Sequence, residues 1–147
     1  MIRPAHANDA EWARALVRRA YALYVPRMGK EPAPMLADYG ALITAGEVYV
    51  LEDAGVPGGL IVIYPKEDAL FIENIAVDPS AQRKGHGRTL LAFAEREAQR
   101  LGLKFLRLYT NAAMTEILTY YPRLGFSETE RREEDGYKRV FFEKRVE

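Results

Sequence analysis

Apolar residues recur at helical intervals near the start of the chain and predict a first helix. The face that they form repeats every three or four residues. Its members are Trp12, Ala15, Leu16, Ala20 and Leu23. Asn8 and Glu11 stand three residues apart before it, which is the spacing of a capping box. We expect the dipeptide Val25-Pro26 to end this helix.

A second helix is predicted a few residues later, after a loop over residues 27–33. It begins near Pro34 and ends at Gly46, which follows the usual preference for proline at the start and glycine at the end of a helix. Its buried face is expected to carry Leu36, Tyr39 and Ile43.

Runs rich in apolar and β-branched residues come next and predict a meander of three strands. The runs are residues 48–52, 60–64 and 70–77. The segments between them, residues 55–59 and 65–68, contain the glycine, proline and aspartate that are typical of tight turns.

The rest of the chain alternates between helix and strand patterns. A helical pattern runs from Gly85 to a glycine stop at Gly102. The elements predicted after it are a strand over residues 103–109, a helix over 112–121, and strands over 126–131 and 138–144 around the turn 134–136.

With a short strand at the start, the predicted order is β α α β β β α β α β β. A meander followed by a strand–helix–strand unit implies an α/β fold, with a mixed sheet and helices on both faces. No linker or repeat divides the chain, so we predict a single domain over residues 1–147.

Composition excludes several classes of function. Lys plus Arg and Asp plus Glu each number 21, so no global field favours nucleic acid or an anionic membrane. The absence of cysteine excludes a disulfide, a thiolate nucleophile and a Cys-ligated metal. The two histidines, His6 and His86, are too few for a usual metal site. No signal stretch or membrane-spanning run is present. We expect a cytoplasmic protein without metal, nucleic-acid or membrane partners.

The most informative segment lies between a predicted strand and the helix after it. Its residues are Gln82, Arg83, Lys84, Gly85, His86, Gly87 and Arg88. The first N–H groups of a helix have no partner within it and carry partial positive charge. Two glycines without a Cβ let an anion approach that backbone, and three cationic side chains add to the rim. A pyrophosphate would fit, although a plain turn with a helix cap is the simpler alternative.

Two other phosphate-binding motifs do not fit. A P-loop requires G-x-x-x-x-G-K-[ST], but Gln82 stands at its first glycine and Arg88 at its lysine. A dinucleotide fingerprint requires a third glycine where Leu90 stands. A nucleotide-binding interaction protein is therefore disfavoured.

The stretch Gln82-Arg83-Lys84-Gly85-His86-Gly87 resembles the Q/R-x-x-G-x-G/A signature of the GNAT superfamily of N-acetyltransferases. The resemblance extends upstream through residues 73–79, and downstream residues 120–126 look like the family's F-Y-x-x-L-G-F segment. It implies a GNAT-like fold. That fold has a central, mixed, mostly antiparallel and twisted sheet of about seven strands, with about four helices on both faces.

The resemblance also implies acetyl-CoA as the acyl donor. The strand before the loop would splay from its neighbour, so that backbone groups of Ile75, Ala76 and Val77 bind the pantetheine arm and polarise the thioester carbonyl. Residues 82–88 would hold the pyrophosphate. Asn111 would bond the pantetheine amides or, alternatively, cap the helix that follows it.

Two catalytic candidates follow from the same resemblance. Tyr121 matches the family tyrosine that protonates the leaving thiolate, with cofactor positioning as its alternative role, while its neighbour Tyr120 is assigned to the core. Glu73 is a lone carboxylate in an apolar strand, and family members often use a Glu there to deprotonate the amine, which has a pKa of about 10.4. A structural carboxylate is the alternative for Glu73. The other family position for a base, near Tyr109, carries no carboxylate.

The predicted function is transfer of an acetyl group to a primary amine of a small molecule or peptide, by direct attack in a ternary complex. Family members often line the acceptor site with the end of the first helix, where Tyr21, Tyr24 and Arg27 stand, although tyrosines at this spacing are also common in cores. A non-catalytic acyl-CoA sensor on the same scaffold is the alternative function. A homodimer is the default symmetric assembly.

Overall fold

Seven strands form one sheet in the computed structural model, which describes residues 1–81 and 84–147. The strands are β1 (Ile2–Pro4), β2 (Val48–Asp53), β3 (Val56–Lys66), β4 (Ala69–Val77), β5 (Phe105–Asn111), β6 (Ser127–Glu134) and β7 (Tyr137–Arg145). Their order in the sheet is β1-β2-β3-β4-β5-β7-β6, and every neighbouring pair is antiparallel except β4 and β5. The predicted mixed, mostly antiparallel sheet is therefore confirmed.

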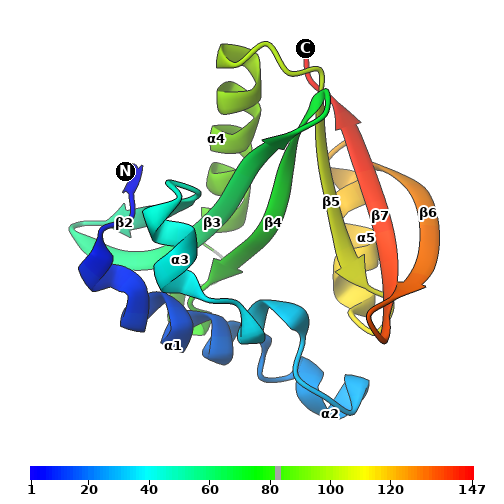
Figure 1. Ribbon diagram of the computed structural model, residues 1–147, viewed down its shortest axis with the longest axis horizontal. Coiled ribbons are helices and arrows are strands. Elements are labelled where there is room, and N and C mark those ends of the chain that lie inside the picture. The colour runs from blue at the N-terminus through cyan, green and yellow to red at the C-terminus, as the bar shows by residue number, and fades with distance from the viewer. Residues whose placement is uncertain (82–83) are drawn as a thin grey trace.

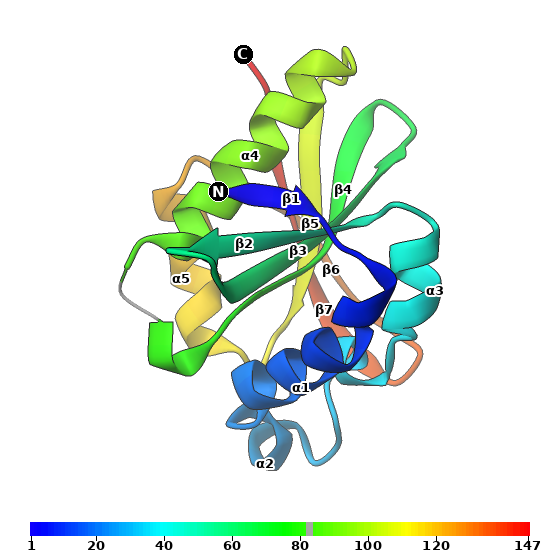
Figure 2. The same cartoon turned by 90° about the vertical axis from the view of Figure 1, so that its left-hand side faces the viewer.

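Helices cover both faces of this sheet (Figure 2). The α-helices are α1 (Ala10–Tyr21), α2 (Tyr24–Met28), α3 (Tyr39–Thr44), α4 (His86–Arg100) and α5 (Thr115–Arg123). Short 3-10 turns add η1 (Ala7–Asp9), η2 (Ala33–Leu36) and η3 (Pro79–Ala81). None of the helices in the described ranges is long and apolar enough to cross a membrane.

Each face of the sheet has its own apolar core. On one face, α4 packs Leu90 against the strand residues Leu106 and Leu108. On the other face, α1 packs Leu16 against Leu60 of β3. Full burial of a leucine contributes about 1.5–3 kcal/mol, so these contacts fasten the helices to both faces.

Strands β4 and β5 lie side by side at one end and diverge toward the other (Figure 1). Their parallel ladder ends at the pair Ile72 and Leu108. Beyond that pair, β4 continues along β3 to Val77, and β5 continues along β7 to Asn111. The splay implied by the family resemblance is therefore present, and it exposes the facing backbone edges of two strands.

A β-bulge at Glu73 marks the start of the splay. On β3, Val62 pairs with Asn74 and Ile63 pairs with Ile72, so the register skips Glu73. A bulge bends its strand and interrupts the alternation of side chains. Glu73 and Asn74 consequently both face the side of the sheet that carries α3 and η2, where they border the same small cavity.

The predicted end of the first helix is wrong. Helix α1 ends at Tyr21, before Leu23, and both Val25 and Pro26 lie inside α2. Proline is tolerated there because the first N–H groups of a helix need no acceptor within the helix. Part of the loop predicted over residues 27–33 is therefore helical.

The first helix is also capped differently from the prediction. Asp9 takes the role assigned to Glu11, because its carboxylate accepts a hydrogen bond from the His6 N–H at 2.7 Å. Asp9 also pairs with Arg3 at 2.9 Å, which ties η1 to strand β1. The cap therefore forms on η1 at His6, two residues before the Asn8 position that the pattern indicated.

The second predicted helix is two separate elements, η2 and α3. Asp38 starts α3, since its Oδ1 accepts from the Ala41 N–H at 3.1 Å. Leu36 is 63% exposed, which contradicts its predicted burial, whereas Met35 is only 8% exposed. Aspartate before a helix is a start signal, and it outweighs the proline that suggested an earlier start.

Two strands are longer than predicted at the end where the sheet opens. Strand β3 begins at Val56, so most of the predicted turn over residues 55–59 is strand. Strand β5 runs to Asn111, and the helix expected from residue 112 begins at Thr115. The extension of β5 lengthens one wall of the splay, and the extension of β3 supports the other wall, β4, as far as Val77.

Candidate active site

The splay between β4 and β5 opens into a cavity of about 540 Å³. Most predicted site residues line it: Tyr21, Tyr24, Glu73, Ile75, Ala76, Val77, Gly85, His86, Gly87, Arg88, Asn111 and Tyr121. Lys84 and Arg27 are not part of the lining. Gln82 and Arg83 lie outside the described residues.

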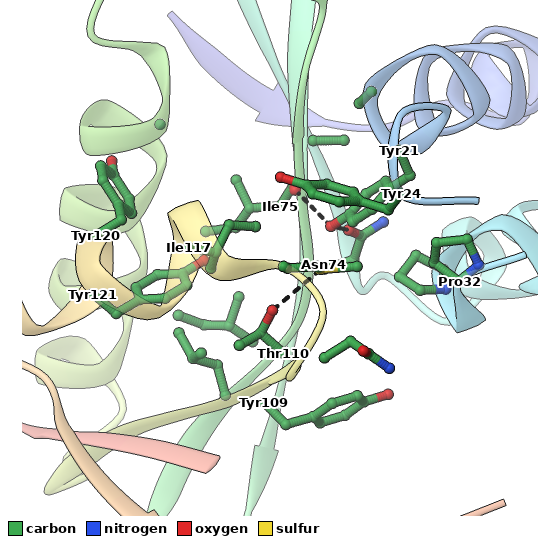
Figure 3. Close-up of a pocket in the computed structure, with 18 of the residues that line it drawn as sticks. Tyr21, Tyr24, Pro32, Asn74, Ile75, Tyr109, Thr110, Ile117, Tyr120 and Tyr121 are labelled. Atoms are coloured by element: carbon green, nitrogen blue, oxygen red, sulfur yellow. Dashed lines mark hydrogen bonds between the residues drawn. The ribbon is translucent and has the colours of Figure 1, made fainter. Parts of the chain in front are cut away.

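The cavity has two different sides (Figure 3). Tyr120 and Tyr121 stand on the side of α4 and α5, and Tyr21 and Tyr24 stand on the opposite side. The edge of β4 runs between them. A ligand in the cavity would therefore contact groups from both faces of the sheet.

The N-terminus of α4 presents backbone donors to this cavity. The first bond within the helix runs from the Thr89 N–H to the Gly85 carbonyl at 3.0 Å. The N–H groups of His86, Gly87 and Arg88 come before it and have no acceptor in the helix. Gly85 adopts the left-handed conformation at φ 78°, which costs glycine little. Together with the helix dipole, these donors form an anion site.

Tyr120 lies over this helix start, a contact that the sequence analysis missed. A Cβ on Gly87 would stand 3.3 Å from the Tyr120 Oη, so the hydroxyl rests against the glycine backbone. The ring packs on the core as predicted. Burial raises the pKa of Tyr120, which keeps the hydroxyl a hydrogen-bond donor at neutral pH. The sequence contains one sign of this contact, because Tyr120 has a hydroxyl at a position where the family motif has phenylalanine.

The side chains of Lys84 and His86 turn toward β2. The Lys84 ammonium lies 4.0 Å from the Asp53 carboxylate, and the His86 Nε2 lies 3.8 Å from it. The His86 ring also packs beside Gly58 of β3. Only the backbone of His86 is therefore placed to serve the anion site.

Ile75 turns its backbone groups into the cavity. The Tyr21 hydroxyl lies 3.1 Å from the Ile75 carbonyl oxygen, so that carbonyl points away from β3. The N–H and the carbonyl of a strand residue point in the same direction, and the Ile75 N–H therefore faces the cavity as well. Val77, two residues further on, repeats this orientation, whereas Ala76 points to β3.

Asn74 connects three helical elements to β4 through a directed chain of hydrogen bonds. Its Nδ2 donates to Tyr39 Oη at 2.9 Å, and the Tyr39 hydroxyl donates to the Pro34 carbonyl at 2.6 Å. Because a carbonyl cannot donate, this order leaves Asn74 Oδ1 to accept from the Tyr21 hydroxyl at 2.6 Å. The single proton of Tyr21 is thereby committed. Its oxygen still offers a lone pair to a donor in the cavity.

Glu73 places a carboxylate on the cavity wall. Its Oε2 accepts from the Tyr64 hydroxyl at 3.1 Å. The cations Arg27 and Arg139 pair with other carboxylates, Glu116 and Glu134. The negative charge of Glu73 is therefore available to attract a cationic group.

Tyr121 directs its hydroxyl toward the cavity from α5 (Figure 3). Its ring packs edge-on against Tyr120 and Phe126, with centroids 5.4 Å apart in both pairs. Burial raises the pKa of Tyr121, so the phenol stays protonated at neutral pH. A protonated hydroxyl in this position can donate a hydrogen bond to a ligand.

Asn111 ends β5 in a local turn. Its Oδ1 accepts from the Ala113 N–H at 2.9 Å. The alternative that Asn111 caps α5 is wrong, because the residue before that helix is Met114. The Asn111 side chain nevertheless lines the cavity.

Arg27 joins two walls of the cavity by a bidentate ion pair. Its Nη1 and Nη2 lie 2.6 Å and 2.9 Å from the two carboxylate oxygens of Glu116, which connects α2 to α5. This pairing lowers the pKa of Glu116 to about 2. Glu116 lines the cavity, so the tie lies at its edge. The partner, 89 residues away in the chain, was not visible in the sequence.

The β6–β7 hairpin supplies lining residues that the sequence analysis missed, Tyr137 and Arg139. It also contacts the segment after α2. The Tyr137 hydroxyl donates to the Glu31 carbonyl at 2.8 Å, and Lys30 donates to the Gly136 carbonyl. Only the fold brings this hairpin next to the N-terminal segment.

A splayed sheet with an anion site at the start of the neighbouring helix is the architecture expected of an acyl-CoA-dependent transferase fold. The family model "Acetyltransferase (GNAT) family" matches residues 11–126. The chain belongs to this family.

The comparisons with individual proteins agree. The [Ribosomal protein bS18]-alanine N-acetyltransferase of Escherichia coli is 39% identical over 61 residues, which are 42% of this chain and 41% of that protein. The chain thus aligns with about two fifths of the length of that curated relative.

Two solved structures share the whole fold. The PaiA N-acetyltransferase from Thermoplasma acidophilum, in complex with coenzyme A, has a TM-score of 0.79 at 18% identity, covering 99% of this chain and 98% of that one. The ribosomal-protein-S18-alanine N-acetyltransferase from Escherichia coli has a TM-score of 0.74 at 23% identity, covering 99% and 93%. At these identities the likeness is one of fold.

Proposed function

We propose that the protein is an N-acetyltransferase that moves an acetyl group from acetyl-CoA to a primary amine. One observation carries this proposal. The anion site of α4, the free backbone edge at Ile75, the Glu73 carboxylate and the Tyr121 hydroxyl all border one cavity. These are the four kinds of group that acetyl transfer from a thioester to an amine requires.

The anion site fits the pyrophosphate of a CoA donor. The backbone donors of His86, Gly87 and Arg88 precede the first helical hydrogen bond, and no side chain on Gly87 covers them. The Tyr120 hydroxyl stands beside them. We also assign Gln82, Arg83 and Lys84 to the pyrophosphate loop, on the strength of the signature alone. Acetyl-CoA supplies an acetyl thioester whose carbonyl carbon is open to attack by an amine.

The edge of β4 would hold the pantetheine arm. We assign this role to the backbone of Ile75 and Val77, with Asn111 opposite on β5, whereas the predicted contribution of Ala76 is corrected because its backbone groups face β3. The Tyr21 hydroxyl lies 3.1 Å from the Ile75 carbonyl and covers that side of it. The Ile75 N–H therefore remains as the donor that would stabilise negative charge on the acetyl oxygen, and a fixed donor of this kind is worth about 10²–10³ in rate.

Glu73 would accept the proton of the attacking amine. A primary amine has a pKa of about 10.4, so at neutral pH it enters as a cation and must lose a proton before it can attack. The Glu73 carboxylate attracts that cation, and the Tyr64 hydroxyl holds the carboxylate in place. The lone pair of Tyr21, whose proton is committed to Asn74, would accept an N–H of the same amine.

Tyr121 would donate a proton, or a hydrogen bond, to the departing sulfur. A phenol with a raised pKa does not protonate a thiolate in water, because thiolate is the weaker base there. Inside the cavity, desolvation raises the basicity of a thiolate in the same way as it raises the pKa of Tyr121. Equal shifts leave the phenol the weaker acid, so the role that fits best is a hydrogen bond from Tyr121 to the departing thiolate.

The acceptor site is proposed on the side of Tyr21 and Tyr24, with Arg27 holding its rim through Glu116. The name of the curated relative states that it acts on the alanine of ribosomal protein bS18, which makes a peptide α-amine one candidate acceptor. A small-molecule amine is the other.

A cytoplasmic location, supported by the absence of cysteine, and a homodimer are also proposed.

The test is a panel of amines with acetyl-CoA, with free thiol followed over time and the acetylated product identified by mass. We expect thiol release that depends on at least one amine. CoA binding is measured separately by calorimetry. Tight binding of acetyl-CoA without thiol release in the presence of any amine would instead indicate a non-catalytic acyl-CoA sensor.

A further inference from the structure

Arg139 of β7 is a half-buried cation on the cavity wall, and most of its N–H groups have no acceptor within residues 1–81 and 84–147. Its side chain is 13% exposed. A guanidinium carries five N–H donors, and here Nη1 donates to Glu134 Oε1 at 2.5 Å. The Nε is enclosed and has no acceptor in the part of the chain that the structure describes.

An enclosed N–H group without an acceptor destabilises the folded protein unless a further group accepts its hydrogen bond. A buried donor without a partner loses its hydration and gains nothing in return, and the loss is larger for a charged group. Native structures contain few such groups, and each calls for an explanation such as a functional role or a bound water or ion. The enclosed Nε cannot meet a ligand without movement of the side chain, but Arg139 lines the cavity, so a ligand there can meet the exposed part of the guanidinium.

The ring of Tyr109 holds the guanidinium flat. The Arg139 Cζ lies 4.2 Å from the centroid of that ring. Since Nη1 is bonded to Glu134 and Nε is enclosed, Nη2 is the nitrogen left for a ligand, and it can donate a charge-assisted hydrogen bond to a carboxylate oxygen. The stacking therefore prepares Arg139 for an acidic group.

Glu73 and Arg139 place opposite charges on the same face of the sheet, with Tyr109 between them. Ile72 pairs with Leu108, which sets Glu73 beside Tyr109 at the start of the splay. Asn111, two residues further along β5, pairs with Arg139. The rest of this wall is largely apolar and includes Tyr24, Met28 and Pro32. A ligand that carries an amine, an acid and an apolar body would match all three features.

We propose that Arg139 binds a carboxylate of the acceptor, so that the acceptor is a small amino-carboxylic acid with an apolar side chain. This inference rests on the proposed function for the fate of the amine. Arg139 is the residue that distinguishes such an acid from a simple amine or a polyamine.

The first test compares acceptors that differ only in the acid. L-phenylalanine is measured against phenethylamine, and L-leucine against isoamylamine, with acetyl-CoA at saturation. We expect kcat/KM to favour each amino acid by about tenfold to a hundredfold. Arg139→Met should abolish that preference by raising KM for the amino acids, with the amines changed less than about threefold. Equal kcat/KM for acids and amines in the unmodified enzyme overturns the proposal.

Arg132→Met is the matched control. Arg132 contacts the same Glu134 and stacks over Phe141 at 4.4 Å, but it does not line the cavity. It should leave the preference for the acid unchanged. Arg139→Lys keeps the charge but loses the planar group that stacks on Tyr109, and we expect it to keep only part of the preference. This variant also serves if Arg139→Met does not fold.

A binding measurement separates this inference from the proposed activity. Calorimetry follows 3-phenylpropionate, which has the acid and the apolar body but no amine, in the presence of CoA. If no amine releases thiol, yet this acid binds the unmodified protein at least tenfold more tightly than Arg139→Met, the acetyl transfer is wrong and the acid site is supported. Equal binding to both proteins overturns the acid site, whatever the activity.

Discussion

The Tyr21 hydroxyl donates a hydrogen bond to Asn74 Oδ1 at 2.6 Å and also lies 3.1 Å from the Ile75 carbonyl. The last residue of α1 is thereby fastened to the free edge of β4, 53 residues away in the chain. This contact places one residue between the proposed donor and acceptor sites. Its removal should therefore affect both stability and acceptor binding.

Tyr21→Phe removes this bond and leaves the buried Asn74 oxygen without its donor. We expect a loss of about 1–3 kcal/mol in the free energy of unfolding, measured in urea, and a rise of about tenfold in KM for the amine. Tyr39→Phe is the control, because Tyr39 bonds the same amide but does not line the large cavity. It should lower stability by a similar amount without the change in KM. An equal KM effect in both variants would show that the amide network acts only through stability.

Tyr121→Phe should lower kcat by about a hundredfold and leave KM for acetyl-CoA nearly unchanged, because the hydroxyl would act on the leaving sulfur alone. The ring remains and keeps its packing against Phe126. Tyr120→Phe is the comparison, since the Tyr120 hydroxyl rests on the anion site. It should raise KM for acetyl-CoA several-fold at constant kcat. Full kcat in Tyr121→Phe removes Tyr121 from the chemistry.

Glu73→Gln should depress kcat/KM most at low pH. Below a pH of about 10.4 the amine is mainly a cation and needs a base, whereas above it the amine is already neutral. The ratio of the unmodified rate to the variant rate should therefore fall as pH rises from 6 to about 10. Glu95→Gln, whose carboxylate pairs with Lys144 outside the cavity, should give a constant ratio near one. A constant and large ratio for Glu73→Gln would point to a structural carboxylate.

The Arg27–Glu116 pair should stabilise the fold in a pH-dependent way. The pKa of Glu116 falls from the ordinary 4.5 to about 2 in the folded protein, so the pair contributes fully above the ordinary value and is lost as pH falls toward 2. Both side chains are well exposed, and salt should screen the effect.

The measurement is urea unfolding of the unmodified protein and Arg27→Met at pH 7, 4 and 3. The difference in unfolding free energy should be largest at pH 7 and should shrink at the two lower values and in molar salt. A difference that does not change with pH would mean that Arg27 stabilises the fold by packing on Tyr24, over which its guanidinium lies at 5.4 Å.

Much of the fold was predictable because its signals are local. Alternation and helical spacing identified the order of the strands along the chain and helix α4, and the glycines around His86 located the helix start that forms the anion site. The boundaries near α2 and η2 were predicted wrongly. There Pro26 lies in the first turn of a helix instead of ending one, and Asp38 caps the start of a helix instead of lying within one. Tertiary contacts determine where these helices begin.

The sequence by itself determined the order of elements, the phosphate-type loop and the candidates Glu73 and Tyr121, since each depends on neighbours within a few residues or on a short motif. Only the tertiary structure decided which side chains meet. The bulge at Glu73, the tie of Tyr21 to Asn74 and the position of Arg139 in the cavity all join residues from separate elements. Side-chain hydrogen bonds and ion pairs act over a few ångströms in space. The residues next to each partner in the sequence therefore do not reveal which distant residue it will contact.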